Sequence, residues 1–216
     1  MPAVLRAELE AIAGAPLVLI ERPQPDSIPA AGVPEFGAIP RGSLTEICGP
    51  TSSGRTSMAI ALMSEITARE ESCALIDTDD AFDPTTAAHA GVRLDRLLWI
   101  RCGGDAERAL KSADLIIQAG GFGLVVFDLG DTPLRQARRI SLTSWFRLRR
   151  AVENTASAIV VIAQEPMAKT CASLVMEMRR GEPDFSGRLL RGMHICTHRL
   201  KPRGEMRYVR LHSRLG

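Results

Sequence analysis

The chain has 216 residues, of which 45% are hydrophobic and 24% are charged, as in an ordinary globular protein with one sizeable core. Its formal net charge of +2 is too small for a protein that wraps duplex DNA, and two Trp, one Tyr and six Phe are too few for stacked-aromatic nucleic-acid platforms. No stretch approaches the about 20 apolar residues of a membrane span. Residues 1–10 also lack the apolar core of a secretory leader. We therefore expect a cytoplasmic protein without membrane contact.

The five cysteines are odd in number, scattered and without a CxxC pair, and three of them lie in apolar, strand-like runs. They are Cys48, Cys73, Cys102, Cys171 and Cys196. We interpret them as buried thiols in a reducing compartment, and the four histidines show no metal-binding spacing.

The chain begins with a pattern that differs from the rest. Apolar residues at helical spacing predict a short helix over residues 4–13, and five prolines between 22 and 41 predict an irregular connector. We treat residues 1–41 as a helix with a proline-rich lead-in, and residues 42–216 as the core domain.

From Gly42 onward, short apolar runs alternate with longer helical patterns. Strands are predicted at 44–48, 73–77, 97–100, 124–128 and 158–163, and helices at 55–69, 84–91, 105–119 and about 134–153. This alternation predicts an α/β fold with a mostly parallel central sheet flanked by helices. Three further strands at 173–179, 193–200 and 207–212, with turn signals at 181–183 and 201–204, predict antiparallel strands at one edge.

A glycine-bounded loop connects the first core strand to its helix. Its residues are Gly49, Pro50, Thr51, Ser52, Ser53, Gly54, Arg55, Thr56 and Ser57. Such a loop directs successive backbone N–H groups into one concavity at the positive end of a helix, where it can cradle the phosphates of ATP or ADP. The Thr56 hydroxyl would then complete the shell of a Mg²⁺ ion. The alternative is a Gly/Ser-rich turn without a ligand.

Arg55 occupies the position where this motif requires lysine. A guanidinium is larger and planar, whereas an ammonium is a compact point charge over the phosphates. Weak ATP hydrolysis and no hydrolysis therefore both stay open. Only three of the 27 basic residues are lysines, so Arg55 is also consistent with a compositional preference that the site tolerates.

The loop and the segments after it resemble the RecA family. The run Ala74-Leu75-Ile76-Asp77-Thr78-Asp79-Asp80-Ala81-Phe82-Asp83-Pro84 is similar to the family segment A-F-I-D-A-E-H-A-L-D-P, and residues 124–128 resemble its Walker B strand. The resemblance covers about residues 40–215 and implies a RecA-like P-loop NTPase fold.

The resemblance also implies roles for three polar residues. Asp79 falls at the position of the glutamate that polarises the attacking water, Asp128 at that of the Mg²⁺-binding aspartate, and Gln164 at that of the glutamine that senses the γ-phosphate. Each has a simpler explanation. Asp79 could cap a helix, Asp128 could be a turn residue at the end of a strand, and Gln164 could be a solvated polar group.

The two loops that hold single-stranded DNA in recombinases, after Asp128 and after Gln164, are short in this chain. The shortened core resembles the ImuA group, which are accessory proteins of bacterial mutagenic translesion synthesis. This resemblance implies a role in DNA repair, the SOS response and damage-induced mutagenesis, with a RecA-type recombinase and the polymerase-like protein ImuB as partners. An active DNA-dependent ATPase that forms filaments and a scaffold that binds no nucleotide are the alternatives, and homo-oligomerisation stays open.

Two basic surfaces are predicted, and weak, non-specific DNA binding would use them. One is the helix around 135–150, where six arginines interleave with apolar residues, and the other is the edge formed by the C-terminal strands. A solvated helix face is the commoner explanation of the first surface. Trp99 and Trp145 are predicted to anchor the core or an interface.

Overall fold

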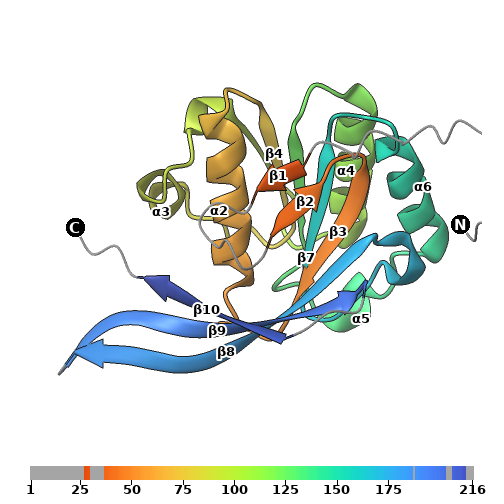
Figure 1. Ribbon diagram of the computed structural model, residues 1–216. Helices are drawn as coiled ribbons and strands as arrows, with labels where there is room; N and C mark the ends of the chain where they lie inside the picture. The colour runs from red at the N-terminus through yellow and green to blue at the C-terminus, as the bar shows by residue number, and fades with distance from the viewer. Residues whose placement is uncertain (1–26, 30–36, 187, 203–205, 213–216) are drawn as a thin grey trace, which may run out of the picture.

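The computed structural model describes residues 27–29, 37–186, 188–202 and 206–212 (Figure 1). In chain order the elements are β1 (Ser27–Pro29), β2 (Ala38–Pro40), β3 (Ser43–Cys48), α2 (Arg55–Ala68), β4 (Cys73–Asp77), α3 (Pro84–His89), η2 (Leu94–Arg96), β5 (Leu97–Arg101), α4 (Ala106–Ala119), β6 (Leu124–Asp128), α5 (Leu134–Ala137), α6 (Leu142–Val152), β7 (Ala158–Ala163), η3 (Lys169–Cys171), β8 (Leu174–Ser186), β9 (Leu189–Lys201) and β10 (Met206–His212). The helix predicted at 4–13 lies outside the described residues. Within the described residues, no helix is long and apolar enough to cross a membrane.

The core is an eight-stranded sheet with the order β10-β9-β8-β3-β7-β6-β4-β5. The strands from β8 to β5 run parallel, whereas β9 pairs antiparallel with β8 and β10 antiparallel with β9. Parallel neighbours need long crossovers, which the helices between the strands supply. The predicted fold class, a mostly parallel sheet with antiparallel C-terminal edge strands, is confirmed.

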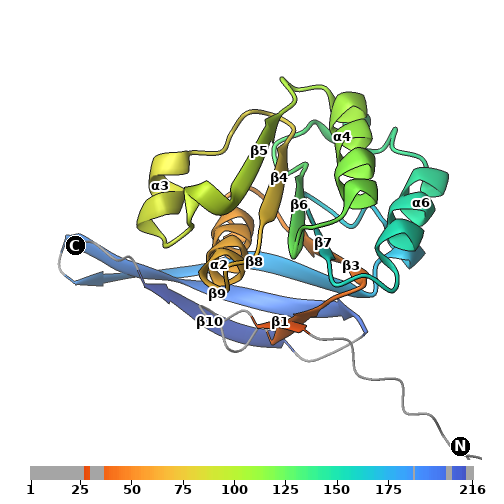
Figure 2. The same cartoon turned by 90° about the horizontal axis from the view of Figure 1, so that it is seen from above.

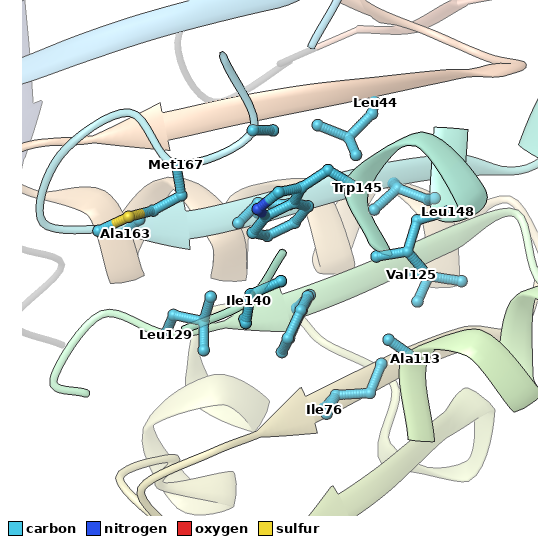
Figure 3. Close-up of a cluster of buried hydrophobic side chains, with 14 of the residues drawn as sticks. Leu44, Ile76, Ala113, Val125, Leu129, Ile140, Trp145, Leu148, Ala163 and Met167 are labelled. Carbon is cyan, nitrogen blue, oxygen red and sulfur yellow. The ribbon is translucent and has the colours of Figure 1, made fainter. Parts of the chain in front are cut away.

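Helices cover both faces of this sheet. Figure 2 shows α2 and α3 on one side of β4 and β5, and α4 and α6 on the other. Successive strand residues point to opposite faces, so Leu75 packs with the α2 side and Ile76 with the α4–α6 side. Trp145 of α6 is fully buried in the second cluster (Figure 3), which confirms it as a core anchor.

The proline-rich lead-in is not wholly irregular, which corrects the prediction for residues 22–41. β1 pairs antiparallel with β2, with Ser27 opposite Pro40 and Pro29 opposite Ala38. Prolines are tolerated because each lies at the end of its strand, where its missing N–H removes no ladder bond from the middle. The two strands bury Ile28 and Ile39 in the core cluster on the α2 side.

The single helix predicted at 134–153 is two helices, α5 and α6. The interruption is at Ser141, whose side chain accepts a hydrogen bond from the Ser144 N–H and so caps the start of α6. The apolar spacing continued across the interruption, because Ala137 and Trp145 both face the core. The periodicity alone therefore could not reveal the cap.

The C-terminal hairpin is longer than predicted, with 13 residues in each of β8 and β9. The turn signal at Gly181–Pro183 lies inside β8, as an irregularity in the pairing between Arg180 and Pro183. The prediction of a turn there was wrong because Gly and Pro also mark bulges at the edges of sheets. Figures 1 and 2 show the hairpin extending away from the body of the sheet as an arm.

A candidate phosphate-binding site

The glycine-bounded loop leaves the carboxyl end of β3 and enters α2. Ser52 and Gly54 both have positive φ, at 62° and 91°, and the turn is closed by a hydrogen bond from the Ser53 N–H to the Pro50 carbonyl. The first helical bond runs from the Met58 N–H to the Gly54 carbonyl. The N–H groups of the first turn therefore have no acceptor within the helix and are available to an anion.

The loop packs directly against the base of the C-terminal hairpin. A β-carbon on Gly49 would clash with the backbone carbonyl oxygen of Met178 in β8. One on Gly54 would clash with the side chain of Ile195 in β9. Gly49 is therefore required by the close approach of a backbone and Gly54 by its positive φ, and the loop lies in contact with the hairpin.

Arg55 turns inward from the start of α2, and its side chain is only 5% exposed. Its guanidinium lies next to Gly130, where an added β-carbon would be 3.7 Å from Arg55 Nη2 and 2.9 Å from Asp128 Oδ1. The Nη1 atom is buried and has no hydrogen-bond partner. Desolvation lowers the pKa of Arg55, an effect that the nearby Asp128 and Asp131 oppose. A buried donor on a cation without a partner is costly, and a phosphate oxygen would satisfy it.

Ser53 also has a buried polar atom without a hydrogen-bond partner. Its side chain is fully buried in the loop, and its Oγ has no hydrogen-bond partner. Ser53 Oγ and Arg55 Nη1 are therefore two buried polar atoms that have no hydrogen-bond partner among the described residues. Both groups lie at the end of the helix where an anion is most favoured.

Thr56, Asp79 and Asp128 line one small cavity of about 90 Å³, together with Asp77, Ala81, Phe82, Gly130 and Asp131. They come from α2, from the segment after β4, and from the end of β6. The carboxyl ends of adjacent parallel strands meet at one edge of the sheet, which is why residues far apart in sequence converge here. The structure brings these three predicted residues together.

Asp128 is held at the end of β6 by the Gly130 N–H, which donates to Oδ1 at 2.8 Å. The pKa of Asp128 is raised to about 6, chiefly by burial; Asp77 and Asp131 also raise it, whereas the Gly130 hydrogen bond and Arg55 lower it. A carboxylate that is costly to ionise in the folded protein gains from a nearby cation.

Asp79 and Gln164 both contact Thr132, a residue that the sequence did not single out. The Thr132 hydroxyl donates to Asp79 Oδ2 at 2.5 Å, and Gln164 Nε2 donates to the Thr132 carbonyl at 3.1 Å. Burial raises the pKa of Asp79, and the bond from Thr132 lowers it. The two predicted catalytic residues therefore touch the same turn after β6, although Gln164 does not line the cavity with Asp79.

Glu46 is a second residue that sequence reasoning missed. It is fully buried in β3, and its Oε1 accepts the N–H groups of Met167 and Ala168 at 2.6 and 2.7 Å. Burial raises its pKa, whereas these two hydrogen bonds and Lys201 lower it. Glu46 thus fixes the turn after Gln164 to the strand that leads into the loop. A charged residue within an apolar run was the available signal.

The residues at this edge fit a Mg²⁺ ion that is held together with a nucleotide. Within the described residues, no three His, Cys, Asp or Glu side chains could hold a metal ion by themselves. A P-loop ion needs fewer protein ligands, because the nucleotide phosphates and water complete its shell. The exposed Thr56 hydroxyl and the Asp128 carboxylate face the same cavity and would hold it.

The other predicted features have mixed outcomes. Cys48, Cys73, Cys102 and Cys171 are buried free thiols, whereas Cys196 is only partly buried. Burial raises the pKa of Cys48 to about 12, so this thiol stays protonated beside the loop. Trp99 donates from Nε1 to Asp77 and packs edge-on against Phe82, which confirms it as an anchor near the cavity.

A parallel sheet with a glycine-bounded loop at the carboxyl end of its first core strand defines a P-loop fold of the recombinase type. The RecA N-terminal domain family matches residues 27–140. The chain belongs to the RecA family.

Individual relatives agree with this assignment. Protein RecA of Rickettsia massiliae is 31% identical over 143 residues, which cover 60% of this chain and 41% of the relative. Protein RecA of Rickettsia prowazekii is 30% identical over the same length. Protein RecA of Rhodospirillum rubrum is 39% identical over 93 residues, which cover 43% of this chain and 25% of the relative. The match therefore spans well under half the length of these relatives.

Proposed function

We propose that this chain binds ATP or ADP with Mg²⁺ and acts, mainly through protein contacts, as an accessory factor in DNA repair and damage-induced mutagenesis. The buried guanidinium of Arg55 carries the nucleotide part of this proposal. Its Nη1 has no hydrogen-bond partner. It lies next to the first turn of α2, whose N–H groups have no acceptor within the helix. A phosphate group would satisfy both sets of donors.

Two short loops support the accessory role. Only residues 129–133 separate β6 from α5, and only residues 164–168 separate β7 from η3. Loops of this length offer little chain with which to enclose a single strand. Within the described residues, Trp145 is buried, and Trp99 packs against Phe82 and has the Arg101 guanidinium over its ring, so neither indole presents a free face for base stacking. A translesion role in the SOS response, with a RecA-type recombinase and an ImuB-like protein as partners, follows from the resemblance to the ImuA group.

Calorimetric titration of the full chain with Mg·ATP and with Mg·ADP tests the nucleotide part. We expect saturable binding of both, and weaker binding by Thr56→Ala, which removes a metal ligand from an exposed position. Absence of binding to the folded wild-type chain would refute the proposal and leave a scaffold that binds no nucleotide.

The convergence of Thr56, Asp79 and Asp128 on one cavity favours a second candidate, an active DNA-dependent ATPase. Asp79 has a raised pKa and a position from which it could polarise a water molecule. The two candidates differ in ATP turnover. Turnover that rises severalfold with a single-stranded oligonucleotide supports the ATPase, and turnover unaffected by DNA supports the accessory factor.

A further inference from the structure

A groove lies on the α4–α6 side of the molecule, where α5 and α6 approach the turn that follows β7. Its volume is about 280 Å³, and we call it the α5 groove. Its apolar lining consists of Ala137, Ile140, Leu142, Trp145, Pro166 and Met167. Ile140, Trp145 and Met167 belong to the buried cluster of Figure 3, so the floor of the groove is the edge of the core.

Apolar side chains also extend from the groove into solvent. Leu142 lines the groove and is 42% exposed, and Phe146 is 41% exposed. The two residues are one helical turn apart and therefore lie on the same face of α6. A partly exposed aromatic side chain beside an apolar hollow is typical of the anchor region of a protein interface.

The charges around the α5 groove are mostly positive. Arg138 pairs with Glu165 at the rim, at 2.7 Å, but both side chains are well exposed, so this pair is weak. Within the described residues, other exposed cations in the same region have no ion pair. These are Arg135, Arg139 and Lys169. The lining of the groove itself carries Arg138 and Lys169 against one carboxylate, that of Glu165.

A second hollow lies across α5 and shares Ile140 with the groove. Its volume is about 450 Å³, and Gln136 and Arg139 line it together with Asp105 and Glu107 at the start of α4. These two carboxylates disfavour an acidic segment in the second hollow, so such a segment would stay in the α5 groove. The Asp105 side chain already caps α4 by accepting the N–H groups of Glu107 and Arg108, so an anion has no free place at that helix end.

We propose that the α5 groove binds a segment of a partner protein in which one or two large apolar side chains are flanked by aspartate or glutamate. The apolar side chains fill the α5 groove beside Ile140, and the carboxylates meet Lys169 and the unpaired arginines near α5. This inference rests on the proposed role through protein contacts, for which it names the surface. A protein segment fits better than a nucleic acid because the floor is aliphatic and the Trp145 ring is buried, which leaves no ring in the groove on which a base could stack.

The test uses the full chain and four fluorescent 12-residue peptides. The first carries Leu and Phe anchors flanked by Asp and Glu. In the second and third, the acidic residues are replaced by Ser or by Lys, and in the fourth the anchors are replaced by Ser. We expect saturable binding of the first peptide alone in fluorescence anisotropy.

Variants locate the binding surface. Leu142→Ser should weaken binding of the first peptide by about tenfold. Phe146→Ser, one turn further along the same face of α6, should weaken it less. Leu115→Ser is the matched control, because Leu115 is 67% exposed on α4 and lines neither hollow. It should leave the affinity unchanged.

Two results would overturn the proposal. One is failure of the acidic, anchored peptide to bind, or binding that Leu142→Ser and Phe146→Ser do not weaken. The other is displacement of the peptide by a thymidine oligonucleotide whose own binding the same variants abolish, which would make the groove a nucleic-acid surface. Titration of each variant with Mg·ATP keeps the two proposals apart. Nucleotide binding without peptide binding refutes only the groove, and peptide binding without nucleotide binding refutes only the nucleotide site.

Discussion

Replacing Asp128 by asparagine should stabilise the nucleotide-free protein while it weakens the proposed site. Burial raises the pKa of Asp128 from its ordinary 3.8 to about 6. The folded protein therefore holds this proton about 2 pH units more tightly than the unfolded chain does, a difference of about 3 kcal/mol. Below pH 3.8 the carboxyl group is protonated in both states and contributes no pH dependence. Between pH 3.8 and 6 the unfolded chain ionises this carboxyl group while the folded protein keeps it protonated, so the free energy of unfolding falls as the pH rises. Above pH 6 both states are ionised, and the full loss of stability is present.

Asp128→Asn removes this charge and keeps an oxygen that can accept the Gly130 N–H. We expect its free energy of unfolding at pH 7.5 to exceed that of the wild type by about 1–3 kcal/mol. We also expect a smaller loss of stability between pH 4 and pH 7, measured by urea denaturation at each pH. Some loss remains, because burial also raises the pKa of Glu46. Glu182→Gln is the control, since Glu182 is an exposed carboxylate of β8 that does not line the cavity. Equal or lower stability of Asp128→Asn at pH 7.5, with an unchanged pH profile, would refute the reasoning.

Three further predictions concern nucleotide and DNA. Thr56→Ala should weaken Mg·ATP binding by calorimetry while its circular dichroism spectrum and melting temperature stay those of the wild type; unchanged affinity would contradict the role of Thr56. Arg55→Lys should raise ATP turnover in a phosphate-release assay, because a compact charge replaces the planar guanidinium; turnover that stays at background would place the defect at Asp79. Single-stranded DNA should bind weakly, with log affinity falling by ~0.7 per contacted phosphate as log salt rises; tight, cooperative binding that survives salt in an anisotropy titration would indicate a filament-forming recombinase.

The fold was largely predictable because its signals are local and repeated. Apolar runs such as residues 124–127 and Ala158–Ala163 are buried on both faces, and the helices α4 and α6 have clear apolar faces. The strands β1 and β2 were missed because they are three residues long, rich in proline and stabilised by their packing under α2. The cap at Ser141 and the bulge near Gly181 depend on contacts that periodicity does not encode.

The site was predictable only as far as its motif. Gly49, Gly54, Thr56 and Asp128 follow a spacing that sequence alone displays. The inward orientation of the Arg55 side chain could not be predicted from that spacing, because it depends on space beside Gly130, which is far away in the sequence. The bridge from Asp79 through Thr132 to Gln164 likewise joins three separate connections and becomes visible only when the strands lie side by side.

The most direct test of the account is the melting temperature of the wild type and of Arg55→Met, each with and without saturating Mg·ATP. With Mg·ATP the wild type should melt at a higher temperature than it does alone, as expected for a ligand that binds only the folded state, and the variant should shift much less. An unchanged wild-type melting temperature with Mg·ATP, or an equal shift in Arg55→Met, would contradict the claim that Arg55 and its loop bind nucleotide.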